Sequence, residues 1–185
     1  MYVPDHDNGA EPHGRWHYSY VSAAQGWTTG RDFRYDYAGI ALRPHHEHGM
    51  VEGYLGAQGY DFGGGYVFDE VLALSYPQVG YQRDDFTGDD LWYRQGPTTS
   101  SLDQVRLTCD MRSGASGSPW LHDFDAETCT GYLVAVHVGS LRGPDGPSGS
   151  GAYGAELGDG AINLYNHVTT TCQVTVPDDP YTRGC

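Results

Sequence analysis

A serine flanked by glycines is the first feature of the sequence with a clear chemical use. Residues 114–120 read GASGSPW, with Ser116 near the centre. Glycine adopts backbone angles that other residues avoid, and small neighbours let a substrate and backbone N–H groups approach the hydroxyl. The segment therefore predicts Ser116 as a nucleophile on a tight turn. A Gly-Ser surface loop remains the alternative, because a bare G-x-S-x-G pattern is a weak signal.

An acid and a histidine stand beside apolar, strand-like segments. Asp36 directly precedes the segment YAGIAL at residues 37–42, and His137 lies inside the run YLVAVHV at residues 132–138. A carboxylate can orient a general base, and an imidazole can receive a substrate carboxylate by charge or by hydrogen bonding. The alternatives are an ordinary acidic strand start for Asp36 and a half-buried strand histidine for His137.

Longer strings around these residues resemble one known family. Residues 110–121 (DMRSGASGSPWL) resemble the nucleophile segment of trypsin-like (chymotrypsin-fold) serine endopeptidases, whose core is G-x-S-G-[GS]-P. Residues 34–42 (RYDYAGIAL) resemble the family's D-[YF]-A strand, and residues 75–77 (SYP) resemble the G-Y-P turn of its bacterial secreted branch. Residues 3–16 resemble that branch's V-P-G…P-x-G-x-W stretch, so the resemblance covers nearly the whole chain.

The resemblance implies a role for each matched position. Ser116 would be the nucleophile and Asp36 the catalytic aspartate, while the backbone N–H groups of Gly114 and Ser116 would form the oxyanion hole. The segment around His137 is similar to the G-[IV]-H-[WS]-G strand of glutamyl endopeptidases, where the histidine helps to bind an acidic side chain. The remaining substrate-binding positions would pair with an extended peptide as an added strand; they are Val138, Gly139 and Ser140.

The sequence departs from the family pattern in two places. Residues 110–112 (DMR) stand where the glutamyl endopeptidase branch carries small hydroxyl residues, so we expect different pocket walls. The family's Thr-Ala-[AG]-His-Cys motif is absent, and its place in the chain order predicts a catalytic histidine upstream of Met1. We therefore expect an N-terminally truncated chain that is inactive as written, because a serine without a general base is a poor nucleophile.

Other histidines are weak candidates for the missing base. The cluster RPHHEH at residues 43–48 is expected to be a solvated loop, with adventitious metal binding as the alternative. His6, His13 and His17 fall in an extended, surface-like region. The acidic loop at residues 84–90 is likewise expected to be a solvated turn, with a calcium site as its alternative.

Short extended segments must position these residues. The chain contains 27 Gly and 10 Pro, with almost no helical periodicity, which indicates an all-β fold. The family resemblance implies two antiparallel β-barrels of chymotrypsin type, with the active site between them. Residues 1–95 would form the remainder of an incomplete first barrel, and residues 96–185 the second. The predicted strands are residues 37–42, 67–76, 104–108, 132–138 and 160–164.

Composition excludes several classes of protein. The chain has 185 residues and a formal net charge of −14, with ten basic residues that are all arginine. This acidic balance argues against nucleic-acid binding. No apolar run approaches the roughly 20 residues of a membrane-spanning helix. The hydrophobic fraction of 38% is sufficient for a folded core.

The cysteines point to an oxidising compartment. Four cysteines form two spaced pairs, Cys109 with Cys129 and Cys172 with Cys185, and none has a C-x-x-C spacing. An even number in this pattern predicts two disulfides and a secreted protein. The chain begins without a signal peptide, so we expect that residues belonging before Met1 are missing.

The leading prediction is a secreted, monomeric serine endopeptidase that acts on polypeptides. It would need no cofactor and no metal, and would bind neither nucleic acid nor membrane. Two alternatives remain. One is a non-catalytic member of the same fold that binds peptides or a partner protein, and the other is an unrelated secreted β-sandwich that binds ligand through its Tyr/Trp surface.

Overall fold

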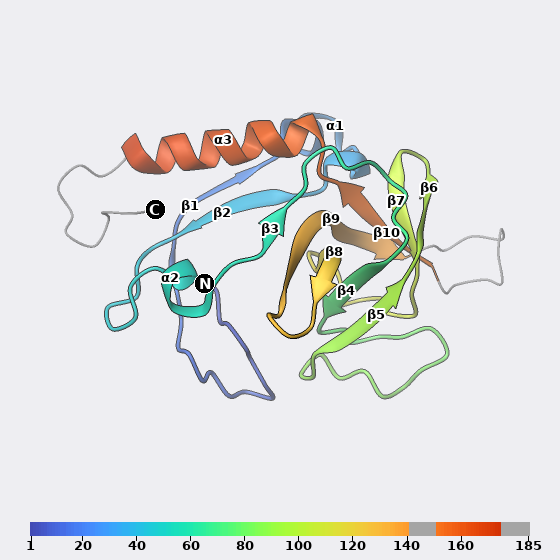
Figure 1. Cartoon of the computed structure of the whole chain (residues 1–185), viewed down its shortest axis with the longest axis horizontal. Helices are drawn as coiled ribbons and strands as arrows, with labels where there is room; N and C mark the ends of the chain where they lie inside the picture. Colours follow the sequence, from blue (N-terminus) through green and yellow to red (C-terminus); the bar gives the residue numbers. More distant parts are fainter. Residues whose placement is uncertain (141–150, 175–185) are drawn as a thin grey trace.

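Two sheets and a long helix form the molecule in the computed structural model, which describes residues 1–140 and 151–174 (Figure 1). The smaller sheet pairs β1 (Tyr18–Ala23) with β2 (Ala38–Leu42), and the larger has the order β5-β4-β8-β9-β10-β7-β6, with β3 beside β9. The larger sheet contains β3 (Gly59–Tyr60), β4 (Val71–Ser75), β5 (Trp92–Gly96), β6 (Thr98–Ser101), β7 (Gln104–Thr108), β8 (Pro119–Asp125), β9 (Thr130–Ser140) and β10 (Gly151–Glu156). The helices are α1 (Gln25–Gly30), α2 (Val51–Leu55) and α3 (Asp159–Val174), with a short 3-10 helix, η1, at Phe33–Tyr35.

The larger sheet curls around its own core (Figure 1). Neighbouring strands along its path are antiparallel, and the outer strand β5 comes into contact with β7, so the sheet closes toward a barrel. Val105 and Leu107 alternate along β7 with more exposed residues, as expected for a strand with one buried face. Trp120 on β8 is completely buried in the same cluster. This half of the molecule therefore has a continuous hydrophobic core.

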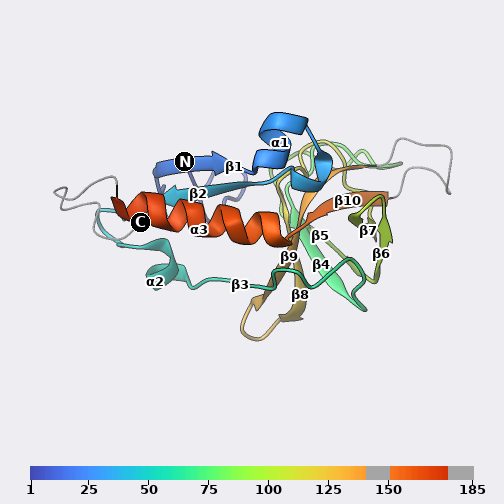
Figure 2. The same cartoon turned by 90° about the horizontal axis from the view of Figure 1, so that it is seen from above.

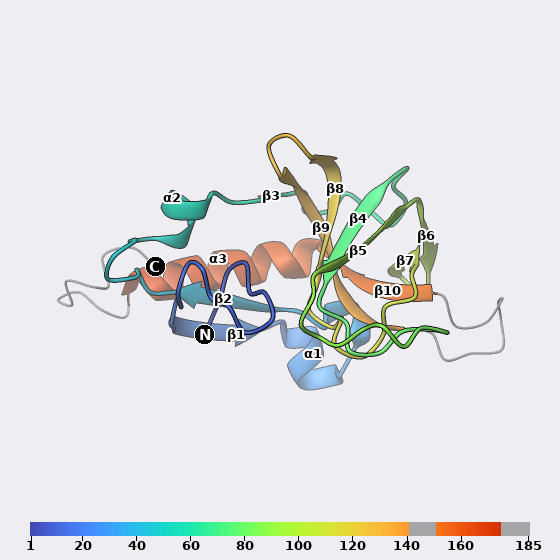
Figure 3. The same cartoon turned by 90° about the horizontal axis from the view of Figure 1, so that it is seen from below.

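The smaller sheet is covered on one face by α3, which runs beside β1 and β2 in Figures 2 and 3. A Cβ atom placed on Gly39 would lie 2.9 Å from Val168 Cγ2, so the helix approaches β2 closely there. Val21 and Ile40 are paired across the two strands, yet 48% and 58% of their surfaces are exposed. The described residues thus supply only two strands of the first barrel, as predicted for an incomplete one.

A second hydrophobic cluster joins the two sheets. Tyr37, at the start of β2, is buried with Ala155 and Leu157 at the end of β10. Val136 and Val138 of β9 pack against the same cluster. The start of β2 is therefore connected by direct packing to the part of β9 that follows the β8 pairing.

Most of the predicted strands are confirmed. β2 and β7 match residues 37–42 and 104–108, β4 occupies part of residues 67–76, and β9 contains residues 132–138. The strand predicted at residues 160–164 is wrong, because these residues begin α3. Ala161, Leu164 and Val168 follow a spacing of three and four and line one face of that helix. A five-residue window was too short to reveal this period.

The division of the chain at residues 95 and 96 stays a prediction. The larger sheet runs across this boundary, because β4 precedes it and pairs with both β5 and β8, and β5 itself crosses it. No helix in the described ranges, 1–140 and 151–174, is long and apolar enough to cross a membrane.

The predicted disulfide between Cys109 and Cys129 is wrong. Both residues are free thiols, Cys109 buried after β7 and Cys129 exposed in the turn between β8 and β9. The strand pairing explains their separation, because β10 brings the end of β7 to the Ser140 end of β9. Cys129 precedes the opposite end of that 11-residue strand, roughly 30 Å away along its length, whereas a disulfide needs Cα atoms within about 7 Å. The second predicted pair lies outside the described side chains, since neither Cys172 nor Cys185 has a described one.

Candidate active site

Two successive turns shape the loop between β7 and β8 that carries Ser116. The N–H of Ala115 donates to the carbonyl of Arg112 at 2.9 Å, and the N–H of Ser118 donates to the carbonyl of Ala115 at 3.2 Å. Ala115 is completely buried, whereas Ser116 is exposed. The turns therefore present the Ser116 hydroxyl to solvent beside a buried neighbour.

Glycine is required at one position of this loop for two separate reasons. Gly114 has a φ of 93°, and a Cβ atom there would lie 2.7 Å from Gln78 N and 2.9 Å from Tyr76 O. Gly117 also has a positive φ, 85°, but a Cβ atom there would meet nothing within 4 Å. The segment that passes beneath Gly114 is bonded to the loop as well, because the N–H of Gln78 donates to the carbonyl of Ser113 at 2.8 Å. The loop is thus fixed on its inner side.

The outer side of the loop is fixed on β9. The N–H of Gly117 donates to the carbonyl of His137 at 2.8 Å, and the N–H of His137 donates to the carbonyl of Ser118 at 2.9 Å. The Ser116 hydroxyl donates to the carbonyl of Val138 at 3.4 Å. These contacts bring three of the sequence-predicted site residues together: Ser116, His137 and Val138.

One edge of β9 is open at this point. β8 pairs with β9 as far as Pro119 opposite Val136, and the nucleophile loop covers His137. Beyond it, Gly139 and Ser140 pair with β10 on one side, and Val138 lies at an irregularity in that pairing. Within the described part of the chain, no strand pairs with their other side. An extended peptide could add there as a further strand.

The backbone around the nucleophile offers two N–H donors. Across residues 1–140 and 151–174, neither Gly114 N–H nor Ser116 N–H donates to a backbone carbonyl. Backbone N–H groups without internal partners beside a nucleophilic serine can stabilise a developing oxyanion. The described geometry is compatible with the oxyanion hole that the sequence suggests for these two residues.

His137 is the most unusual polar side chain of the site. Only 2% of its surface is exposed, and its ring meets the edge of Trp120 at a centroid distance of 5.8 Å. Among the described residues, neither of its ring nitrogens has a hydrogen-bond partner. Burial lowers the pKa of His137 to about 4, because desolvation disfavours the charged imidazolium. The ring is therefore neutral at pH 7 and holds an unused donor and an unused acceptor.

Asp36 follows η1 and directly precedes Tyr37, whose ring lies in the cluster that Val138 contacts. Desolvation raises the pKa of Asp36, and among the described residues its carboxylate has no hydrogen bond or ion pair with a side chain. Packing therefore connects the segment of Asp36 to the strand that Ser116 contacts. Among the described residues, the Asp36 carboxylate is therefore available to bind a further group.

No histidine in the described ranges bonds to Ser116 Oγ or to the Asp36 carboxylate. Imidazoles with polar partners bond elsewhere; examples are His13 with Tyr54, His122 with the carbonyl of Glu70, and His167 with Tyr20. The arrangement therefore contains the nucleophile and an acid without a base between them.

Sequence reasoning missed an ion network at the start of the nucleophile loop. Asp110 accepts hydrogen bonds from Arg94 and from Arg83, the latter at 3.3 Å. Burial alone would raise the pKa of Asp110, but the hydrogen bonds and positive charges of the two arginines outweigh it and lower the pKa. Asp110 therefore serves as an internal anion rather than as a free acid at the base of a pocket.

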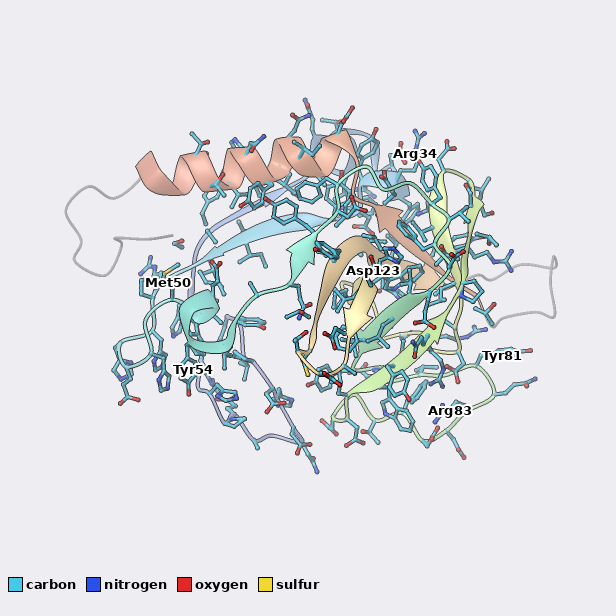
Figure 4. All side chains as sticks on the ribbon, in the orientation of Figure 1. Arg34, Met50, Tyr54, Tyr81, Arg83 and Asp123 are labelled. Atoms are coloured by element: carbon cyan, nitrogen blue, oxygen red, sulfur yellow. The ribbon has the colours of Figure 1, made fainter. Side chains whose placement is uncertain are left out.

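The aromatic rings around Arg83 hold this network in place. The guanidinium carbon lies 4.4 Å from the ring centroid of Phe86 and 4.5 Å from that of Trp92, and the same group bonds Asp85. Figure 4 labels Arg83 near Tyr81 on the larger-sheet side of the molecule. The predicted acidic loop at residues 84–90 is thus not wholly solvated, since Asp85 belongs to this network. The only sequence signal was the unusual segment at residues 110–112.

Comparisons with known proteins rest on structure alone, because no protein-family model and no curated protein matches the sequence. The chain is similar to the protease Anisep from Arthrobacter nicotinovorans, with a TM-score of 0.76 and 23% identity over 91% of this chain and 73% of that one. It is equally similar to the thermostable serine protease AL20 from an extremophilic microorganism, with a TM-score of 0.76, 24% identity and coverage of 91% and 74%.

A third solved structure, a Glu endopeptidase in complex with MPD, has a TM-score of 0.69 and 18% identity over 91% of this chain and 70% of that one. Likeness at these identities establishes fold rather than activity. Each of the three alignments covers 91% of this chain. The chain therefore has the chymotrypsin-type fold of bacterial serine proteases, with an incomplete first barrel among its described residues.

Proposed function

We propose that this protein is a serine endopeptidase in which Ser116 is the nucleophile. The observation that carries the proposal is the position of the Ser116 hydroxyl, 3.4 Å from Val138 O at the open edge of β9. A peptide added along that edge would bring a backbone carbonyl next to the serine. Gly114 N–H and Ser116 N–H would stabilise the oxyanion that forms when Ser116 attacks.

The general base in this proposal lies outside the described residues. Asp36 would orient an imidazole supplied by the rest of the first barrel, and that imidazole would accept the Ser116 proton. The 185-residue chain alone would then have only the weak catalysis that comes from binding and oxyanion stabilisation. The incomplete first barrel and the unpaired Asp36 carboxylate both support this view.

His137 would set a preference for an acidic residue before the scissile bond. Both ring nitrogens are buried, so a substrate carboxylate would reach them only when the adjoining residues move aside, and the neutral ring would then donate an N–H hydrogen bond to it. The negative charge would then favour proton uptake by the imidazole. Buried polar atoms without partners are uncommon in folded proteins, and a bound carboxylate would satisfy one of them. The fold match to a Glu endopeptidase supports the same preference.

The proposed setting is extracellular, with polypeptides as substrates and a monomer as the working unit. The similarity in fold to bacterial proteases supports polypeptide substrates. The cysteine content supports an extracellular location less strongly, because Cys109 and Cys129 are free thiols.

The test compares the chain with a version extended by its upstream coding sequence through a Thr-Ala-[AG]-His-Cys motif. We expect a fluorophosphonate probe to label Ser116 rapidly only in the extended protein, and Ser116→Ala to abolish both labelling and peptide hydrolysis. A mixed peptide library should then show cleavage after Glu, with loss of that preference in His137→Ala. Hydrolysis that survives Ser116→Ala would contradict the proposal.

Non-catalytic peptide binding is the second candidate, and it is favoured because no imidazole among the described residues is hydrogen-bonded to the Ser116 hydroxyl. The two candidate functions differ in whether a bound peptide is cleaved. A peptide that binds the extended protein and remains intact, with no serine labelled by the probe, would support the binding role.

A further inference from the structure

The loop that joins β2 to α2 brings three potential metal ligands together. One ligand atom from each of His45, Glu47 and His48 lies within 4.8 Å of the others. The loop is closed by a pair of backbone hydrogen bonds between His45 and Gly49, at 2.8 and 2.9 Å. Gly49 has a φ of 71°, which lets the chain turn back so tightly. The backbone of this five-residue loop is therefore closed at both ends.

Aromatic packing fixes the two imidazoles. The rings of His45 and His48 are stacked at a centroid distance of 4.8 Å and an interplanar angle of 13°, and His48 stacks on Tyr54 at 4.1 Å. Trp16 is completely buried beneath the loop, 5.0 Å from the ring of His45. Its indole N–H donates to the carbonyl of Gly49 at 3.0 Å. The packing holds the ligand atoms close together, and one of the stacked rings must turn to bind the same ion as the other, because a metal lies in the plane of each imidazole that binds it.

The ligand types select a class of metal. Two imidazoles and one carboxylate suit Zn²⁺ and neighbouring transition metals, whereas Ca²⁺ and Mg²⁺ prefer oxygen ligands alone. Three protein ligands leave a fourth tetrahedral position for water. The formal net charge of −14 raises the local concentration of cations near the surface.

We propose that His45, Glu47 and His48 form a binding site for Zn²⁺ or a similar divalent transition metal. The site differs from the sequence prediction of a solvated loop without a metal. It begins three residues after β2 ends, whereas Asp36 precedes the start of β2, so the metal serves the structure rather than the peptide-cleaving chemistry. Figure 4 shows Tyr54 at α2, away from Arg83 and Tyr81 on the larger-sheet side. Bound metal fixes the turn of the loop between β2 and α2.

The test uses the full chain and measures Zn²⁺ binding by isothermal titration calorimetry, with thermal unfolding in parallel. We expect one equivalent to bind with a micromolar or tighter dissociation constant, and Zn²⁺ to raise the melting temperature. His45→Asn, Glu47→Gln and His48→Asn should each weaken binding by about tenfold or more, since even outer-shell partners of metal ligands contribute about 10- to 100-fold. Glu47→Gln is the most informative variant, because Glu47 is exposed and its carboxylate is not needed to close the loop.

His46→Asn is the control within the loop, because His46 is exposed and is not one of the three proposed ligands, although it lies 3.5 Å from Glu47 and its ring packs on that of His45. Binding by His46→Asn should stay within about twofold of the unmodified chain, well short of the tenfold loss for a ligand. Quenching by Cu²⁺ gives a second readout. Trp16 lies close enough to lose fluorescence, and EDTA should restore it. Weak binding of several equivalents, or equal losses in His46→Asn and His48→Asn, would overturn the site.

Discussion

The two sheets of the molecule differ in their number of strands and in how much hydrophobic core they bury. The larger sheet buries a continuous core and holds the nucleophile loop through backbone hydrogen bonds on both sides. The smaller sheet has two strands, and α3 covers one face while Val21 and Ile40 remain exposed on the strands. Two strands alone are marginally stable in water. The larger sheet thus has a core of its own that can hold the nucleophile loop in place. The smaller sheet, which would position the base, needs further packing partners beyond its two strands and α3.

Matched leucine and isoleucine truncations test this difference most strongly. Leu107→Ala empties a position that is 1% exposed in the larger sheet, and we expect a loss of about 3 to 5 kcal/mol in the free energy of unfolding. Ile40→Ala removes a side chain that is 58% exposed, and its effect should stay within about 0.5 kcal/mol. Urea unfolding measures both. A large loss for Ile40→Ala would mean that the exposed face is covered in solution.

The buried imidazole of His137 should make the larger sheet sensitive to mild acid. Its folded pKa of about 4 lies below its unfolded value of 6.5, so the unfolded state binds more protons between these pH values. Stability is therefore retained above pH 6.5 and falls as the pH drops toward 4, by about 3 kcal/mol in total for this group. The measurement is the free energy of unfolding against pH for the chain and for His137→Leu, which should lack this component.

Val134→Ala is the control for that experiment, because it removes a buried side chain from the same strand that has no titratable group. It should lower the stability without removing its dependence on pH. If His137→Leu keeps the full acid sensitivity, the imidazole has a partner in solution and its pKa is not depressed.

Two glycines in one loop separate steric from conformational effects. Gly114→Ala would combine a φ of 93° with a contact of 2.7 Å to Gln78 N, and we expect a loss of about 2 kcal/mol or more. Gly117→Ala has the conformational penalty alone, about 1 kcal/mol. Thermal unfolding of the two variants should show the order directly. Equal losses would mean that the segment beneath Gly114 moves aside.

The smallest expected effect concerns the ion network beside the nucleophile loop. Asp110→Asn removes the charge shared by Arg83 and Arg94, and we expect a loss of about 1 kcal/mol that shrinks in high salt. Asp103→Asn is the control, because its contact with Arg34 at 3.3 Å involves a side chain that is 69% exposed. Unfolding at low and high salt should distinguish the two. Equal, negligible effects would show that the network does not stabilise the loop.

Local patterns account for what the sequence could predict. The Gly-Ser turn at Ser116 and the strands of Asp36 and His137 are short segments whose conformation depends on neighbouring residues. The strands at residues 104–108 and 132–138 were predictable for the same reason, since each has β-type composition along its whole length.

Long-range relations account for what could not be predicted. Arg83 and Arg94 reach Asp110 only because β4, β5 and the nucleophile loop meet in the folded sheet. The separation of Cys109 from Cys129 follows from strand register, which the number and spacing of cysteines do not encode. Contacts between residues distant in sequence require the topology to be known first.

The buried thiol of Cys109 can be used to measure how often the larger sheet opens to solvent. Desolvation raises the pKa of the buried Cys109 thiol to about 11, so almost no reactive thiolate is present while the sheet is closed. Cys129, exposed at the far turn, should react with an alkylating reagent from the outset. Peptide-resolved mass spectrometry can read the two positions separately within one chain. The rate at which Cys109 becomes alkylated would then measure how often this half of the molecule opens, with no residue introduced as a label.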